Sequence, residues 1–168
     1  MPDLDHEPII ERVLRFVQKM IEYSDGLFYI AHQVVNAPLI IAVDLQREDF
    51  LMAMLAEPGA TRHDLKIISQ VFAYMQERIV SIVPPNQLIP YIGDNCFTPP
   101  RHAIIDGCTT QLVSAEIYAE LIEPIDSRLI SFYYRKAMIH LRSVSNQHIP
   151  TFQRMVKLIC LQINDHAA

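Results

Sequence analysis

Glycine is scarce in this chain, which has four glycines among 168 residues. They stand at Gly26, Gly59, Gly93 and Gly107. These positions are too far apart for the glycine-rich loops that bring bare backbone against a nucleotide phosphate. Enzymes that bind dinucleotides or use a P-loop are therefore excluded.

Cysteine and basic charge are also limited. The three cysteines, Cys96, Cys108 and Cys160, are odd in number and widely spaced, which favours reduced thiols over a disulfide framework or a zinc site. We therefore predict no metal site, and no motif requires a cofactor. The net charge is −5 and the 14 basic residues are scattered, whereas a nucleic-acid interface needs a concentrated basic face.

Targeting signals are missing from the sequence as given. Residues 1–5 are acidic and lack the charged and then apolar pattern of a signal peptide, so we expect a cytoplasmic protein. The longest uncharged run, 26–43, has polar residues in its middle and does not predict a membrane span. Its secondary structure is open between helix and strand, and its spacing favours a buried helix.

Apolar residues are abundant, at 51% of the chain, which predicts one compact domain over 1–168. Spacing of three and four between apolar residues predicts an all-α bundle of six or seven helices. The expected helices cover 7–23, 27–35, 39–56, 61–83, 101–123, 127–144 and 150–164. We expect Asp5 to cap the first of them, and Thr61 with Asp64 to form a capping box for the fourth.

Five prolines stiffen the segment 84–100, which we expect to be a long connection between helices. Long ordered loops are often binding loops or lids, although its apolar residues could instead simply cover the helices. Tyr91, Phe97, Arg101 and His102 would lie near the mouth of a pocket behind it.

The segment 101–144 is expected to be an antiparallel helical hairpin that turns near Pro124. Glu116 and Glu123 on its first helix would then face Arg135 and Arg128 on the second, as a ladder of opposite charges. Exposed pairs of this kind fix orientation more than stability, since each contributes about 0–1 kcal/mol.

Two short patterns resemble motifs of known families. Arg135 and His140, with four residues between them, resemble the arginine–histidine motif of the HEPN family of small helical proteins, many of which cleave RNA. The resemblance implies that this pair polarises a ribose 2′-hydroxyl and the adjacent phosphate.

His63 and Asp64 resemble the doublet of the HD phosphohydrolase family. That resemblance implies a metal site completed by His32 and by Asp106 or Asp126. Separately, His102 and Asp106 would share one face of a helix, either as half of a metal site or as a simple surface pair.

No convergent catalytic set follows from these patterns, and the apolar content exceeds what one small bundle needs. The leading hypothesis is therefore a non-catalytic interaction or regulatory domain, similar to an adaptor or chaperone, that associates with itself or another protein. One alternative is a bundle that binds a small apolar ligand, or a haem- or bilin-type cofactor, as a sensor. The other alternative is an RNase that resembles the HEPN family.

Overall fold

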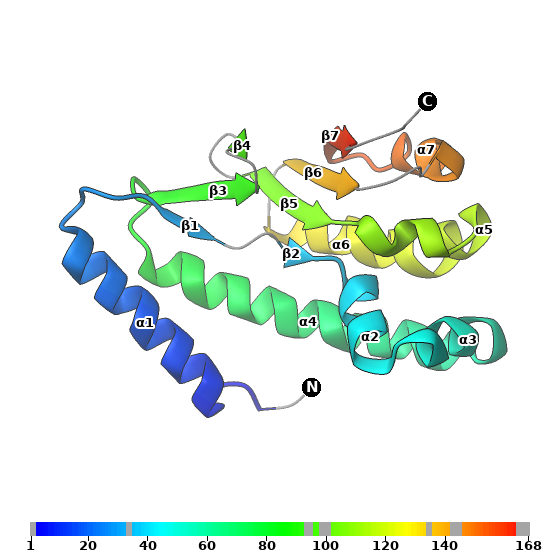
Figure 1. Cartoon of the computed structure of the whole chain (residues 1–168), viewed down its shortest axis with the longest axis horizontal. Coiled ribbons are helices and arrows are strands. Elements are labelled where there is room, and N and C mark those ends of the chain that lie inside the picture. Colours follow the sequence, from blue (N-terminus) through cyan, green and yellow to red (C-terminus); the bar gives the residue numbers. More distant parts are fainter. Residues whose placement is uncertain are drawn as a thin grey trace.

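The computed structural model describes residues 3–32, 35–92, 96–97, 102–133, 136–141 and 146–163. Helices pack against parallel strands, so the chain has a mixed α/β fold (Figure 1). The expectation of an all-α bundle is wrong, because several of the apolar runs read as helices are strands.

The helical elements include short 3₁₀ and π turns as well as α-helices. They are α1 (Pro8–Ser24), α2 (Pro38–Gln46), α3 (Glu48–Ala56), α4 (Pro58–Ile82), the 3₁₀ turn η1 (Cys108–Leu112), α5 (Ala115–Ile117), the π turn η2 (Tyr118–Ile122), α6 (Glu123–Tyr133), the 3₁₀ turn η3 (Asn146–His148) and α7 (Ile149–Phe152). Among the described residues, no helix combines the length and the apolar character that crossing a bilayer requires.

The strands form two small sheets. They are β1 (Ile30–His32), β2 (Val35–Asn36), β3 (Leu88–Ile92), β4 (Cys96–Phe97), β5 (His102–Asp106), β6 (Lys136–Leu141) and β7 (Leu158–Ile163). The larger sheet has the order β2-β5-β6-β7, and all its neighbours are parallel. In the smaller sheet β3 pairs in parallel with β1 and antiparallel with β4.

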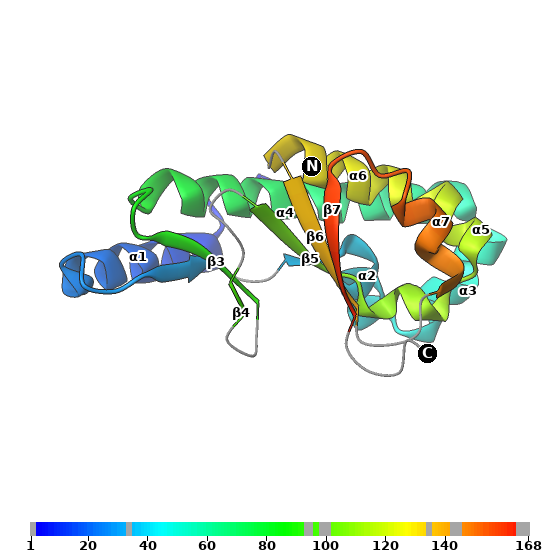
Figure 2. The ribbon, with the colours of Figure 1, turned by 90° about the horizontal axis from the view of Figure 1, so that it is seen from above.

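Helical crossovers connect the strands of the larger sheet, as parallel pairing requires. The chain passes through η1, α5, η2 and α6 between β5 and β6, and through η3 and α7 between β6 and β7. Figure 2 shows β5, β6 and β7 side by side, with their carboxyl ends pointing the same way. Side chains at these ends therefore meet along one edge.

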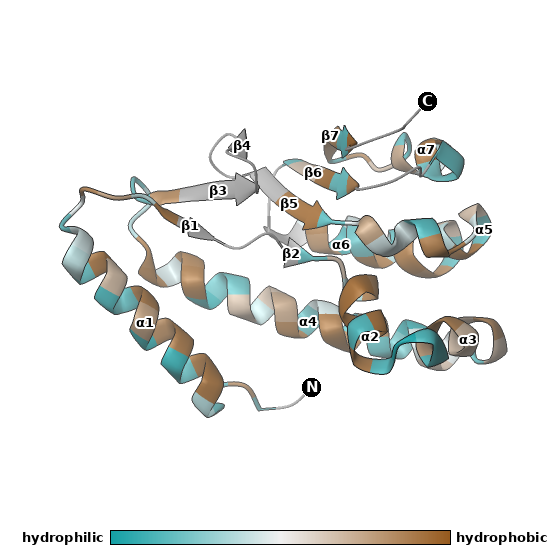
Figure 3. Ribbon diagram, viewed as in Figure 1, coloured by the Kyte–Doolittle hydropathy of each residue, from teal (hydrophilic) through white to brown (hydrophobic). Residues whose placement is uncertain are grey.

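The main core lies between one face of this sheet and the helices. Ile105, Ile139 and Leu141 contribute to it from the strands, and each is at most 2% exposed. Alternate positions point the other way, so Ile104 and Met138 form a separate small cluster on the opposite face. Figure 3 shows apolar residues running along both the strands and the helices that cover them.

Two long helices agree with the sequence predictions, but their caps do not. The helices expected at 7–23 and 61–83 correspond to α1 and α4. Each starts at a proline, Pro8 or Pro58, because a proline lacks the amide hydrogen that the first helical turn leaves unused. Asp5 does not cap α1, whose N-cap residue is Glu7. Thr61 lies inside α4, where its hydroxyl donates back to the carbonyl of Pro58 at 3.1 Å.

The segment between these helices differs from its expected form. Residues 27–35 were expected to be a buried helix, and they contain β1 and the start of β2. Residues 39–56 were expected to be one helix, but Arg47 has a φ of 57° and separates α2 from α3.

The prediction of a helical hairpin at 101–144 is wrong. Its first part is β5, its middle forms the helical run from α5 through η2 to α6, and its end includes β6. Pro124 lies inside this run and not at a turn, because the π turn before it widens the helix and accommodates a residue without an amide hydrogen. Likewise the segment 84–100 contains β3 and β4, and the expected last helix is reduced to α7 and followed by β7.

One carboxyl side chain of this helical run is buried. Asp126 is 1% exposed, and the Tyr118 hydroxyl donates to its Oδ2 at 3.2 Å. Its Oδ1 has no hydrogen-bond partner among the described residues. Burial raises the pKa of Asp126 to about 7; the Tyr118 hydrogen bond lowers it in part, and the charge of Glu123 raises it again. Asp126 therefore keeps its proton in the folded chain at pH values below about 7.

Asp126→Asn should therefore remove a pH dependence of stability. Between pH 4 and pH 7 the folded state holds the Asp126 proton while the unfolded chain has released it, so the wild type loses stability as pH rises. The limiting slope for one proton is about 1.4 kcal/mol per pH unit. Urea unfolding across this range should show a flatter profile for Asp126→Asn, and the wild-type profile for Asp49→Asn on the exposed surface of α3. An unchanged slope in Asp126→Asn would refute the buried acid.

Candidate metal centre

A row of polar side chains crosses the carboxyl end of the four-stranded sheet. Asn36 pairs in register with Asp106, Asp106 with His140, and His140 with Gln162. Residues directly opposite one another in a sheet share a face, so all four point to the face away from the main core. We call Asn36, Asp106, His140 and Gln162 the polar row. In open parallel sheets, ligands bind beyond the carboxyl ends of the strands.

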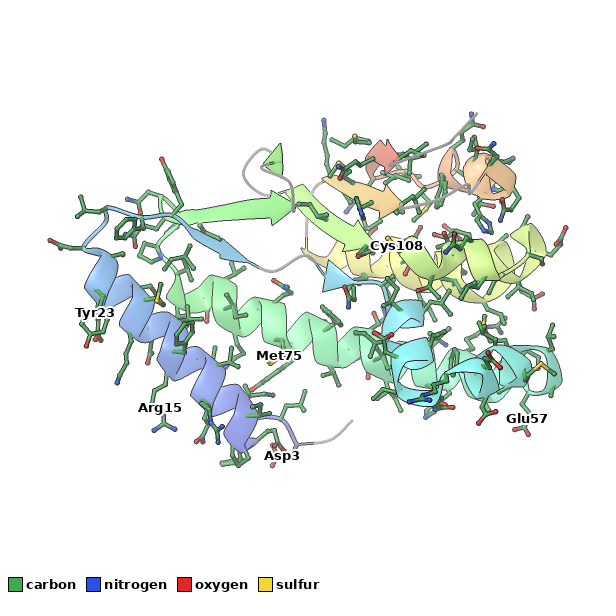
Figure 4. The ribbon with its side chains drawn as sticks, in the orientation of Figure 1. Asp3, Arg15, Tyr23, Glu57, Met75 and Cys108 are labelled. Atoms are coloured by element: carbon green, nitrogen blue, oxygen red, sulfur yellow. The ribbon has the colours of Figure 1, made fainter. Side chains whose placement is uncertain are left out.

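Gly107 brings a thiol to this row. Its amide donates to the carbonyl of His140 at 2.8 Å, so the chain leaves β5 pressed against β6. A Cβ at this position would lie 2.9 Å from Cγ2 of Ile139, so a larger residue would force its neighbours to shift. Cys108 follows, and its amide donates to Oδ1 of Asp106 at 2.9 Å. Figure 4 labels Cys108 just beyond the end of β5.

Asp106, Cys108 and His140 together make a candidate metal centre. One ligand atom from each lies within 4.8 Å of the other two. A tetrahedral zinc ion at usual bond lengths holds its ligand atoms about 3.3–3.8 Å apart, so closing on an ion needs shifts on the order of 1 Å. A nitrogen, a sulfur and an oxygen ligand suit zinc, which accepts all three.

Gln162 orients the histidine. Nδ1 of His140 lies 3.0 Å from the side-chain oxygen of Gln162. An amide oxygen only accepts hydrogen bonds, so Nδ1 carries the ring proton and Nε2 keeps its lone pair. Metal-bound histidines commonly make such a contact through the other nitrogen. His140 is 9% exposed, which limits its movement, whereas Asp106 and Cys108 are half-buried at the edge.

Three of the four residues predicted for a ligand mouth lie on strands. Tyr91 and Phe97 are backbone partners in the antiparallel pair of β3 and β4. His102 begins β5, at the end opposite Asp106, and is paired in register with Lys136. Arg101 lies outside the described residues. Binding of a ligand by these four residues stays a prediction.

The helical arrangement expected for the HEPN-like pair and for the charge ladder is not found in the described residues. His140 belongs to a strand and not to a helix shared with Arg135, which itself lies outside the described residues. Glu123 and Arg128 lie on the single helix α6 and not on two facing helices. Glu123 instead accepts a hydrogen bond from the Ser127 hydroxyl at 2.6 Å.

The metal site expected from the HD-like doublet does not form among the described residues. The one group of three candidate donors found there is that of Asp106, Cys108 and His140, and it includes neither His63 nor Asp126. His63 is exposed on α4, whereas the side chain of Asp126, on α6, is buried. Asp106, which the sequence analysis offered as a ligand completing the HD-like set and as a partner of His102, belongs to this group.

The sequence contains a signal for the residues that were missed. Three apolar runs each end in a polar residue, namely Ala103–Asp106, Ala137–His140 and Leu158–Gln162. Buried parallel strands are near-continuous apolar runs, so a polar residue at their ends marks the carboxyl edge. Cys108 follows two residues after the first of these ends, beyond the glycine.

Comparison with known proteins adds no relative. No family model, curated protein or solved structure matches the chain.

Gly107→Ala should disturb the approach of β5 to β6. The added methyl would meet Ile139 and the side chain of Leu141 at 3.1 Å, and overpacking of this kind costs about 1–3 kcal/mol. Chemical denaturation should show that loss. Gly59→Ala is the matched control, because its Cβ would meet nothing within 4 Å and alanine favours the first turn of α4. Equal stability of the two variants would contradict the close approach.

Proposed function

We propose that this chain binds one zinc ion through Asp106, Cys108 and His140 at the carboxyl edge of its sheet. The observation that carries the proposal is the convergence of these three donors from β5, β6 and the turn after β5. Positions 106, 108 and 140 come together only through parallel pairing, which also sets Gln162 against the histidine.

Three protein ligands leave one position of a tetrahedral ion open. Sites of this kind are usually catalytic, whereas structural zinc sites use four protein ligands. The ion would supply a Lewis acid at that open position. The proposed function is therefore metal-dependent catalysis on a small molecule that enters at the carboxyl edge of the sheet.

The protein's own residues would orient this chemistry. The Cys108 amide holds Oδ1 of Asp106, and Gln162 holds Nδ1 of His140, so two of the three donors are fixed by hydrogen bonds. Asn36 lies beside Asp106 in the polar row, where its amide could bind a substrate oxygen. A reducing cytoplasm, which the sequence predicts as the compartment, would keep the Cys108 thiol reduced, as a metal ligand requires.

Zinc titration of metal-free protein tests the site. We expect one ion per chain by calorimetry and by metal analysis, with affinity at least about 100-fold lower in Cys108→Ser and His140→Ala. Gln162→Ala should lose about 10- to 100-fold, as loss of such supporting contacts does.

The matched controls are Cys160→Ser and His63→Ala, which replace an exposed cysteine and an exposed histidine elsewhere. They should keep wild-type affinity. A wild type that binds no zinc, or equal losses in the controls, would overturn the site.

We propose as a second function that the chain binds another protein, itself included. Its support is an apolar groove of about 430 Å³ between α1, α2 and α4, lined by Val13, Ile41, Leu45, Ile68, Phe72 and Met75, among others. Figure 4 labels Met75 on the side of α4 that is nearer to α1. Leu45 is 72% exposed at the groove, and large exposed apolar surfaces are commonly covered by a partner.

Light scattering over a range of concentrations tests self-association. We expect the wild-type mass to rise above 19.3 kDa, and Leu45→Lys to return it toward that value by placing a charge in the groove. Leu112→Lys changes an equally large side chain that is 55% exposed on η1, and should behave as wild type. A monomer at every concentration would argue against self-association.

A further inference from the structure

A cleft on the helical side of the molecule carries an excess of positive charge. It has a volume of about 360 Å³ and lies between α4 and the run of η2 and α6. Arg62 and Lys66 line it from α4, and Arg128 lines it from α6. Glu120 is the one acidic residue among the described residues of the lining, where three cations thus face one anion.

Arg62 is fixed in this cleft by an irregularity of the neighbouring helix. Pro124 has no amide hydrogen to donate to the carbonyl of Glu120 four residues earlier. Nη2 of Arg62 lies 3.5 Å from that carbonyl oxygen and 3.4 Å from Oε1 of Glu120. A guanidinium has five N–H donors, so Arg62 keeps others to offer a ligand.

Lys66 and Arg128, unlike Arg62, have no carboxylate partner among the described residues. Within the described ranges the ion pairs are Arg62 with Glu120 and His6 with Asp3. Lys66 follows Arg62 by one helical turn, and Arg128 follows Pro124 by one turn, so unpaired cations line both walls. Their concentration in one cleft contrasts with the net charge of −5 of the whole chain.

Neutral donors complete the walls. Ser69 and Gln70 line the same cleft from α4, and Leu121 and Ile125 provide apolar surface from the other side. Positive charges that share a partly enclosed space repel one another, and an anion of two or more charges relieves that repulsion. Cationic side chains with neutral donors are the usual ligands of phosphate groups.

We propose that this cleft binds a small polyanion, of the class of phosphate esters and pyrophosphate. The cleft lies among the helices that cover the core face of the sheet, whereas Asp106 and His140 point to the other face. It is therefore a second site, and binding there stabilises the folded chain through mass action.

Calorimetric titration with inorganic pyrophosphate tests this cleft. The neutral chelator 1,10-phenanthroline should be present, so that metal at Asp106 does not capture the probe. We expect saturable binding by the wild type with a dissociation constant below about 1 mM, and at least about tenfold weaker binding by Lys66→Glu and by Arg128→Glu. Both substitutions are on exposed side chains and should leave the fold intact, which circular dichroism verifies.

Lys19→Glu is the matched control, since it reverses one exposed lysine on α1, away from the cleft. It should retain wild-type affinity. A parallel titration with citrate separates the two ligand chemistries: binding of pyrophosphate alone supports recognition of phosphate, and equal binding of both supports recognition by charge. Absence of saturable binding by the wild type, or equal weakening in Lys19→Glu, would overturn the proposal.

Discussion

Parallel hydrogen bonding of β6 to both β5 and β7 is the interaction on which the rest of the structure depends. It aligns Asp106, His140 and Gln162 in one row, although they are far apart in the sequence. The same alternation sends Ile105, Ile139 and Leu161 to the opposite face, where the helices cover them. A shift of β6 by one residue would exchange its faces, moving Ile139 away from the main core and placing His140 in it. Formation of the core and assembly of the polar row are therefore one event.

The sequence predicted the long amphipathic helices and failed at the strands, for one physical reason. Helices α1 and α4 have a polar side toward water, so their apolar residues recur every three or four positions. Ile104 and Ile105 of β5 and residues 137–141 of β6 are buried on both faces of the sheet, so their apolar runs show no alternation that would reveal them as strands. Short apolar runs are ambiguous between buried strand and buried helix, and the misreading of 101–144 followed from that ambiguity.

The candidate site shows the same limit. Asp106 and His140 each attracted attention in the sequence as single residues, but for helical geometries that do not exist. Their actual relation is a backbone register, which is a property of pairing and not of spacing. The turn predicted near Pro124 was wrong for a related reason. Proline normally interrupts a helix, but here a π turn and the Arg62 guanidinium accommodate it. That accommodation also places a fixed cation in the cleft beside Lys66.

Gly107 shows what one of the few glycines contributes to the structure. Four glycines cannot build a phosphate-binding loop, but one suffices where two strands must approach too closely for a side chain. The Gly107 amide donates a hydrogen bond to the carbonyl of His140, and Cys108 is the next residue along the chain. A larger residue would push the turn away from β6 and separate the thiol from the imidazole. The packing of the main core against Ile139 and the closeness of the three donors thus depend on the same missing methyl group.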